Sequence, residues 1–162
     1  MNKEELLAQF QQIIETSNEE ELHVAKLLAD GMEKKQKKQN GTYIGALMHV
    51  QNEWNANGDL TMKIPNTPII QNNLNIVHGG ITATLLDSAM GTFAGSLLSE
   101  GKSAVTSEMK INYVAPGTGS FLTCNAALIH KGKRTIVLQG QVFRDDGELI
   151  AHSTATFYII DK

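Results

Sequence analysis

The sequence predicts an α+β fold in which an antiparallel sheet curls around one long, buried helix. Residues 79–99 carry few charges on any face of a helix, which is typical of a buried helix. Four strand-like runs follow this segment in succession, with turn sequences between them. The N-terminal 40 residues instead show apolar residues at helical spacing. Because helices and strands occur in separate runs along the chain, they indicate the α+β class.

Two helices are expected at the N-terminus, within residues 3–38. Their apolar stripes consist of Leu6, Leu7, Phe10, Ile13 and Ile14, then Leu22, Ala25, Leu28 and Ala29. Ser17 followed by Glu20 fits a capping box and predicts the start of the second helix. The basic run at 34–38 lies near the end of that helix, where cations are favoured. We interpret it as a solvated helix end, with a phosphate- or nucleic-acid-binding patch as the alternative.

The remaining elements are expected in the order β-β-α-β-β-β-β. Residues 45–65 predict a strand, a turn at Asn57-Gly58-Asp59 and a second strand. Residues 66–77 form a polar loop before the long helix at 79–99. The turn signals P-G-T-G, K-G-K and D-D-G then separate the last strands. Those strands are expected at residues 103–115, 120–130, 134–144 and 148–160.

The length of 162 residues favours one domain with a substantial core. We expect a helical extension at residues 1–42 and the globular domain at residues 43–162. The net charge of -3 gives no electrostatic reason to expect nucleic acid as a partner. No apolar run approaches the roughly 20 residues that cross a bilayer, so no membrane is expected. The first residues lack the apolar block of a signal peptide, and Cys124 is the only cysteine. We therefore expect a cytoplasmic protein.

Several kinds of site find no support in the sequence. There is no G-x-S-x-G nucleophile motif and no H-E-x-x-H zinc motif. The segment at 95–103 resembles a phosphate-binding P-loop, but it has five residues between its glycines and follows a helix. The five histidines show no metal-ligand spacing, so no metal is expected. Cys124 is expected to be a small core residue.

One constellation remains, the glycines of His78-Gly79-Gly80 and the mid-helix acid Asp87. Glycines let a substrate approach the backbone, and the first N–H groups of a helix have no intrahelical partner. A carbonyl placed there would be polarised. Asp87 lies about 12 Å further along the helix, too far to act readily on the same atom. Two antiparallel copies would bring them together across a two-fold axis. Alternatively, the glycines only allow a tight turn, and Asp87 is a hydrogen-bonded interface residue.

The pattern from His78 to Asp87, H-G-G-x-x-x-x-x-x-D, resembles the hotdog-fold acyl-CoA thioesterases. It is most similar to the phenylacetate-pathway (PaaI-like) branch of the 4-hydroxybenzoyl-CoA thioesterase superfamily. The resemblance covers about residues 43–160. It includes N-x-x-x-x-x-H-G-G from Asn72, I-N-Y-V-A-P at 111–116, and the closing D-D-G-E-L-I-A-H-S-T-A-T-F.

This resemblance implies hydrolysis of an acyl-CoA thioester at a site shared by two subunits. Asp87 would be the general base that activates water, or the nucleophile. The Gly79 N–H would polarise the thioester carbonyl, and Asn72 would position water or substrate. His78 would orient the loop, and Thr106 would help to hold the water.

The resemblance also implies partners and a binding mode. Gly80 would leave room for the substrate, and the family often has glycine at the position of Asn75. Lys131, Lys133 and Arg134 are candidates for binding the phosphates of coenzyme A, or else form a solvated turn. A homodimer would form the active site, and two dimers would pair into a homotetramer. No cofactor is expected, because coenzyme A is part of the substrate.

Three alternatives stay open at this point. A hotdog protein can bind acyl-CoA without catalysis, as a sensor or carrier. Hotdog dehydratases use a different His–acid arrangement, for which the sequence has no matching motif. The N-terminal helices can instead recruit a partner. The acyl group is not specified, although four residues are candidates for shaping its groove: Met90, Phe93, Met109 and Tyr113.

Overall fold

The computed structural model describes residues 2–56 and 58–162, so Asn57 of the predicted turn lies outside the described residues. The chain divides into two compact units, which separate after His49. The second unit is Val50–Lys162. The predicted domain boundary between residues 42 and 43 stays a prediction.

The first unit contains three helices, α1 (Lys3–Thr16), α2 (Glu19–Gln36) and α3 (Tyr43–Leu47). The capping box of α2 uses Asn18 and Glu21, one residue later than the predicted pair. The Asn18 side chain accepts a hydrogen bond of 3.0 Å from the Glu21 N–H. Ser17 does not serve as the cap because its hydroxyl donates to the Ile13 carbonyl at 2.6 Å, at the end of α1.

The first predicted strand was wrong at its beginning, because residues 43–47 form helix α3. Thr42 caps this helix by accepting a hydrogen bond from the Gly45 N–H at 3.1 Å. Helix α3 packs on α2 where Gly31 lies: a Cβ at Gly31 would be 3.0 Å from the Leu47 Cα. A short apolar run does not distinguish strand from helix by periodicity, and here a local cap favours the helix.

The second unit is built on a six-stranded antiparallel sheet with the strand order β1-β2-β4-β5-β6-β3. Each of the last four strands lies within two residues of its predicted bounds at either end, so that part of the prediction is confirmed. A 3-10 turn, η1 (Pro68–Ile70), interrupts the loop after β2. The strands are β1 (Gln51–Trp54), β2 (Leu60–Pro65), β3 (Lys102–Tyr113), β4 (Phe121–Lys131), β5 (Thr135–Arg144) and β6 (Leu149–Asp161).

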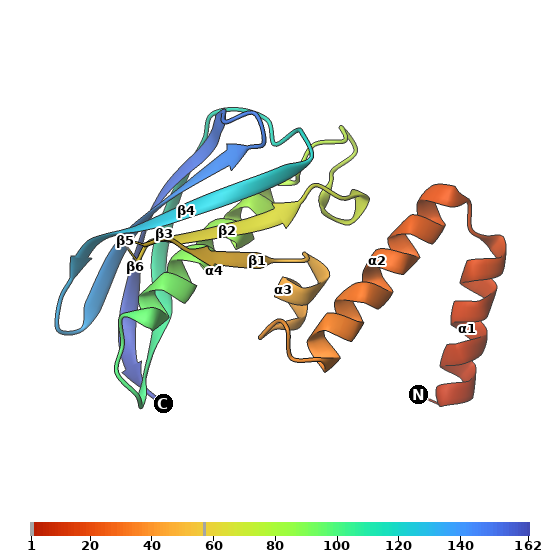
Figure 1. Cartoon of the computed structure of the whole chain (residues 1–162), viewed down its shortest axis with the longest axis horizontal. Coiled ribbons are helices and arrows are strands. Elements are labelled where there is room, and N and C mark those ends of the chain that lie inside the picture. Colours follow the sequence, from red (N-terminus) through yellow and green to blue (C-terminus); the bar gives the residue numbers. More distant parts are fainter. Residues whose placement is uncertain (1, 57) are drawn as a thin grey trace. The chain divides into compact units, whose positions relative to one another are not determined.

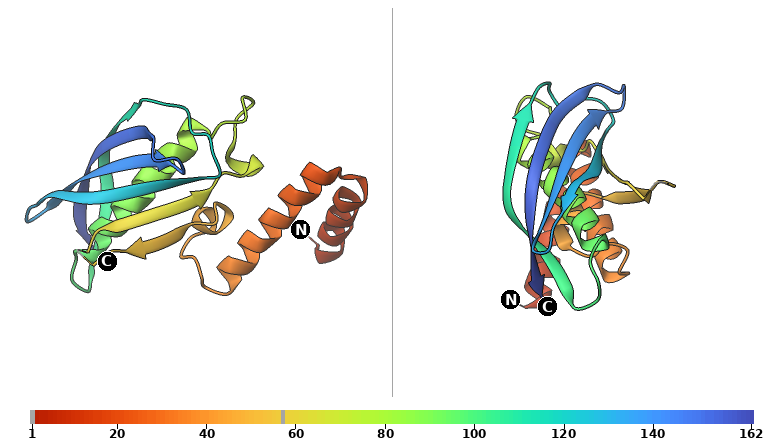
Figure 2. Two further views of the ribbon diagram at one scale, coloured as in Figure 1. Left: turned by 45° about the horizontal axis from the view of Figure 1, so that its top comes forward. Right: turned by 90° about the vertical axis from the view of Figure 1, so that its left-hand side faces the viewer.

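Helix α4 (Gly79–Ser96) lies along the concave face of the curved sheet, as Figures 1 and 2 show. The predicted buried helix is confirmed, although it ends three residues earlier than expected. Its buried side chains are Thr82, Leu85, Leu86, Ala89, Met90, Phe93 and Ala94. Gly140 of β5 permits a close approach, because a Cβ there would be 2.8 Å from the Leu86 Cδ2. Nearer the C-terminal end of α4, Trp54 of β1 packs edge-on against Phe93, with ring centroids 5.9 Å apart.

Strand β3 forms one edge of this sheet. It pairs with β6 on one side, and no described strand pairs with its other side. Its register with β6 shifts between Thr106 and Glu108, which marks a β-bulge. Bulges re-aim side chains at such edges. Among the described helices of the chain, none is both long enough and apolar enough to cross a membrane.

Candidate functional site

The N-terminus of α4 is held in place by the loop that precedes it. The His78 N–H donates to the Ile70 carbonyl at 2.9 Å, and the Val77 N–H donates to the Gly117 carbonyl at 2.8 Å. Val77 also forms an isolated antiparallel bridge with Gln71. Backbone hydrogen bonds to the Ile70 and Gly117 segments therefore fix the direction in which the chain enters α4.

His78 is the N-cap residue of α4, and its ring is used for capping. The His78 Nδ1 accepts a hydrogen bond of 2.9 Å from the Gly80 N–H. The His78 carbonyl accepts bonds from the N–H groups of Ile81 and Thr82. The Gly79 N–H is different, because no described group accepts a hydrogen bond from it, and Gly79 is exposed. One donor at the positive end of the helix dipole is thus free to bind a ligand atom.

Tyr113, at the end of β3, binds the carbonyl of the same glycine. Its hydroxyl donates a hydrogen bond of 2.9 Å to the Gly79 carbonyl. A Cβ at Gly79 would meet the Tyr113 ring at 3.7 Å, which is an ordinary contact distance. Tyr113 is 54% exposed, so its ring forms part of the surface beside the free Gly79 N–H. The sequence placed Tyr113 among possible groove residues, but it did not predict this bond.

Asp87 and Thr106 come together between α4 and β3. The Thr106 hydroxyl donates a hydrogen bond of 2.7 Å to the Asp87 Oδ1. Asp87 is half-buried, and Oδ2 has no hydrogen-bond partner among the described residues. The carboxylate is therefore oriented through one oxygen, which leaves the other oxygen for a water molecule or a ligand.

Asn72 and Asn75 shape the turn before α4. The Asn72 side-chain oxygen accepts from the Leu74 N–H at 2.9 Å, and the Asn72 carbonyl accepts from the Asn75 N–H at 3.0 Å. Asn75 has a φ of 57°, in the left-handed region that glycine and asparagine adopt most readily. The structure does not bring Asn72 into hydrogen-bond contact with Asp87 or Gly79 of the same chain.

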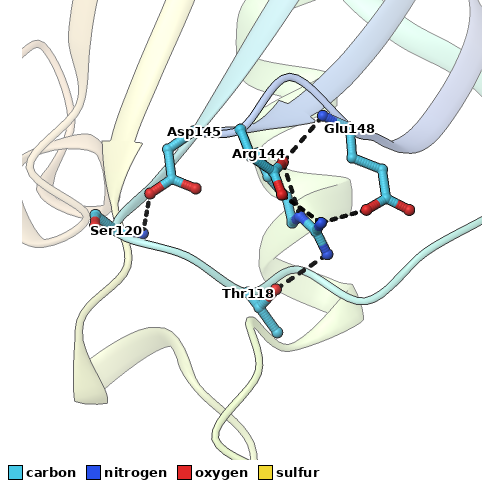
Figure 3. A network of polar contacts seen from close by, with 6 residues as sticks. Thr118, Ser120, Arg144, Asp145 and Glu148 are labelled. Atoms are coloured by element: carbon cyan, nitrogen blue, oxygen red, sulfur yellow. Dashed lines mark hydrogen bonds and ion pairs between the residues drawn. The ribbon is translucent and has the colours of Figure 1, made fainter.

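An ionic cluster supports the loop behind this site, as Figure 3 shows. The Arg144 guanidinium donates to the Thr118 hydroxyl at 3.2 Å and to Asp146 at 2.6 Å, and it also pairs with Glu148. The Ser120 N–H donates to Asp145 at 2.7 Å and holds the pKa of that carboxyl below its ordinary value. The cluster ties the β5–β6 hairpin to the loop whose Gly117 carbonyl binds Val77.

The predicted basic residues lie toward the other end of α4. Lys131 donates a hydrogen bond to the Leu97 carbonyl, at the C-terminal cap of α4. Lys133 and Arg134 are exposed and line a hollow of about 540 Å³, together with the ion pair of Lys102 and Asp161. Because α4 has 18 residues, this end lies about 27 Å from Gly79 in the same chain.

Two of the predicted groove residues lie in the core, as does Cys124. Met90 is fully buried and Phe93 is 6% exposed, so neither offers a surface to a ligand in the single chain. Burial raises the pKa of the Cys124 thiol to about 12, which leaves it protonated and unreactive at neutral pH. The interpretation of Cys124 as a core residue is confirmed. Met109 is half-buried.

Comparison with known proteins gives a consistent result along the chain. The sequence model of the Thioesterase superfamily matches residues 74–151, the segment that contains the H-G-G turn, Asp87 and Thr106. The medium/long-chain acyl-CoA thioesterase YigI of Salmonella typhimurium is 28% identical over 58% of this chain and 70% of its own length. The Saccharolobus solfataricus protein named "Putative esterase SSO1253" is 31% identical over 52% of this chain. The matched part of this chain spans 55% of that protein.

Solved structures extend the likeness over nearly the whole chain. The BH2602 protein of Bacillus halodurans, crystallised with CoA, is 40% identical. Its match covers 95% of this chain and 99% of that protein, with a TM-score of 0.89. The Escherichia coli PaaI protein of the phenylacetic acid degradation operon is 21% identical, and its TM-score is 0.68. That match covers 83% of this chain and 96% of PaaI, and it shows a shared fold.

Proposed function

This chain belongs to the thioesterase superfamily and has its hotdog fold, and from this premise we propose that it hydrolyses acyl-CoA thioesters to a free acid and coenzyme A. The observation that carries the proposal is the hydrogen bond from Thr106 to Asp87. It orients a half-buried carboxylate next to a sheet edge, on the same helix that begins with a free N–H. The relative YigI is named as an acyl-CoA thioesterase, and BH2602 was crystallised with CoA.

Asp87 activates the attacking water in this proposal. One carboxylate oxygen is held by Thr106, so the other can accept a proton from water while the water oxygen attacks the thioester carbonyl. Direct attack by the carboxylate is the second route. It would form an anhydride with the acyl group, which water then hydrolyses. Both routes need an ionised Asp87 and release coenzyme A as the thiol after proton transfer to its sulfur.

The Gly79 N–H stabilises the oxyanion that develops on the carbonyl oxygen. It is the free donor at the N-terminus of α4, where the helix dipole favours negative charge. The ring of His78 is engaged in capping Gly80, which agrees with a role in orienting the turn. The side-chain nitrogen of Asn72 has no partner among the described residues, and in the proposal it positions the water or the substrate.

The complete site needs two subunits. Gly79 and Asp87 lie eight residues apart on one helix, or about 12 Å. The open edge of β3 beside Thr106 offers unpaired backbone groups to a second copy. A two-fold axis there would make the two α4 helices antiparallel and would bring Gly79 of one subunit toward Asp87 of the other. Two such dimers would form a homotetramer, as the family resemblance implies.

The same symmetry suggests where coenzyme A lies. Lys133 and Arg134 are near the C-terminal end of α4, far from the Gly79 of their own chain. With the two helices antiparallel, the N-terminus of the partner's helix, and so the partner's Gly79, would lie closer to them. Two exposed cations suit the phosphates of coenzyme A. Gly80 leaves room for the substrate next to the turn, and the acyl group then extends past Tyr113.

The proposal is tested by following thiol release from a panel of acyl-CoA thioesters, including the medium and long chains on which YigI is named to act. We expect Asp87→Asn to lower kcat by about 10²–10⁴-fold, the range for loss of a general base. Glu33→Gln, at an exposed acid of α2 paired with Lys37, is the matched control and should keep full activity. If the wild-type protein binds acyl-CoA but hydrolyses none of the panel, it is a non-catalytic sensor or carrier.

Mixed dimers test the sharing of the site. Gly79→Pro removes the free N–H at the first helical position, where proline fits the helix. We expect each single variant to be nearly inactive, and a mixed dimer of Gly79→Pro with Asp87→Asn to regain one competent site of two. Absence of recovery in mixed dimers of confirmed composition would place both groups in one chain and contradict the shared site.

A further inference from the structure

The apolar side chains of α1 and α2 have no cover within the helical unit. Helix α1 has no buried residue at all, and Leu7, Phe10 and Ile14 are each more than half exposed. On α2, Leu22 and Met32 are similarly open, at 41% and 44%. A helix of 14 residues, such as α1, is marginal in water without packing on an apolar face. An apolar surface of this extent is typical of an interaction site.

The two helices diverge from their connection at 17–18 (Figures 1 and 2). Two hollows of about 660 and 650 Å³ are lined by residues of both helices, including Phe10, Ala25 and Leu28. Apart from Lys26, the second hollow is lined by apolar side chains alone. The shape and the chemistry both suit another helix.

Helix α2 carries the spacing of a helix that pairs with another helix. Leu22, Ala25, Ala29 and Met32 follow one another at intervals of three, four and three residues, which we call the α2 seam. Two alanines at its centre allow a close approach of backbones. A different part of α2, at Gly31, already packs against α3.

The charges of α2 favour a second copy of this chain in antiparallel orientation. Its first turn is acidic, with Glu19, Glu20 and Glu21, and its last turn is basic, with Lys34 and Lys35. A parallel copy would bring acid against acid and base against base, which is unfavourable. An antiparallel copy brings each acidic end to a basic end.

Charge also argues against a lipid surface as the occupant. Residues 2–38 contain six lysines and eight acidic residues, which gives a net charge of 6 − 8 = -2. Helices that lie on anionic membranes instead carry lysine and arginine on their polar faces.

We propose that the α2 seam binds the α2 seam of a second copy of this chain in antiparallel orientation. Centred between Ala25 and Ala29, the contact pairs Leu22 with Met32 of the partner subunit and Ala25 with Ala29 of the partner subunit. Helix α1 of each copy then covers the remaining apolar surface of the pair, so that four helices share one core. This contact is separate from the β3 edge and does not depend on the proposed activity.

Cysteine cross-linking of the full chain tests the orientation. In a Cys124→Ala background, chains with Ala25→Cys and chains with Ala29→Cys are co-expressed with different tags and mildly oxidised. We expect disulfide-linked heterodimers from the mixture and little product from either variant alone, since only the mixed pair brings the Cα atoms within about 7 Å. Self-linked dimers of each single variant would show parallel pairing and overturn the proposal.

Two charge variants test whether the seam itself makes the contact. Met32→Glu places a charge in the seam and should reduce the mixed cross-link at least tenfold, whereas Gln12→Glu adds the same charge on an exposed position of α1 that lines neither hollow and should preserve it. His23→Cys, exposed and outside the seam, serves as the control for random collision. Absence of the mixed cross-link in a folded protein overturns the proposal. If the mixed cross-link is absent and the wild-type chain binds phosphatidylglycerol vesicles, the proposal is also overturned, and the occupant is a lipid surface.

Discussion

The hydroxyl of Thr106 lies 2.7 Å from the carboxylate of Asp87 and joins strand β3 to helix α4 at the candidate site. The carboxylate is half-buried, so its orientation depends on few neighbours. Thr106→Val keeps the shape of the side chain and removes the donor. We expect kcat to fall about 10–100-fold, because a hydrogen bond to a charged group contributes about 1.5–3 kcal/mol. Steady-state kinetics with the best acyl-CoA substrate measures this loss.

Thr156→Val is the matched control for Thr106→Val. Thr156 also donates its hydroxyl to a carboxylate between β3 and β6, namely that of Glu108, at 2.7 Å. The Thr156→Val variant should keep kcat within about twofold of wild type. Thr106→Ser, which retains the hydroxyl, should recover most of the activity. Equal effects of Thr106→Val and Thr156→Val would assign Thr106 a purely structural role.

Tyr113 anchors the carbonyl of the glycine whose N–H is free. Tyr113→Phe removes the bond but keeps the ring, so the Gly79 N–H should be less firmly placed. We expect a decrease in kcat of about 5–10-fold, near the 1 kcal/mol of a typical hydrogen bond, with a smaller change in KM. Tyr43→Phe, at an exposed tyrosine of α3, provides the comparison and should be neutral. A change in KM alone would point to acyl contact instead of positioning.

His49 makes the helical unit sensitive to acid. Burial lowers the pKa of His49, and the ammonium of Lys34, 2.8 Å from its Nδ1, lowers it further. Asp30 opposes this shift, and Lys26 adds to it. The neutral ring therefore contributes stability that is present above the unfolded pKa of about 6.5 and is lost as pH falls through the folded pKa.

Helicity and melting temperature, followed by circular dichroism from pH 7.5 down to 5, should fall more steeply for wild type than for His49→Gln. Glutamine can accept the Lys34 bond without gaining a proton. His130→Gln, at an exposed histidine, is the control and should follow the wild-type curve. Parallel curves for wild type and His49→Gln would exclude His49 as the acid-sensitive group.

Gly119 is required by the contact between two loops. It has a φ of 85°, and a Cβ there would lie 2.1 Å from the Asp145 Oδ1. Gly119→Ala should therefore destabilise by about 2–4 kcal/mol, from left-handed strain and from the displaced carboxylate. Gly101→Ala separates the two causes, because Gly101 has a φ of 81° and open space around the Cβ. Urea unfolding should show the smaller loss, about 1 kcal/mol, for Gly101→Ala.

Much of the sheet was predictable because its signals are local. Strands β4, β5 and β6 alternate buried and intermediate residues over much of their length, and turns such as Asp146-Gly147 separate them. Helix α4 was identified by its lack of charge. The short helix at 43–47 was not predicted, because a run of five residues fits both the helical and the strand period. The Thr42 cap decides in favour of the helix. The α2 cap moved by one residue because Ser17 was already bonded to α1.

The site was predictable only in part, for a different reason. Asp87 and Gly79 share one helix, so their spacing follows from the rise per residue. The contact between Thr106 and Asp87 depends on which face of β3 meets α4. The resemblance to a family suggested Thr106, but residue spacing did not. The bond from Tyr113 to Gly79 depends on the register of β3 after a bulge, and the attachment of Lys131 to Leu97 depends on the length of β4. No sequence signal reports either.

The open side of β3 also matters before the proposed dimer has formed. A chain that has folded but has found no partner presents a 12-residue strand whose outer backbone groups are unpaired. Such an edge accepts any strand that reaches it, including those of incompletely folded chains. In the proposed dimer, the concentration of folded subunits therefore determines whether correct pairing is faster than aggregation. Chains made side by side on one messenger RNA would meet soonest, and slow, dilute synthesis would carry the greatest risk.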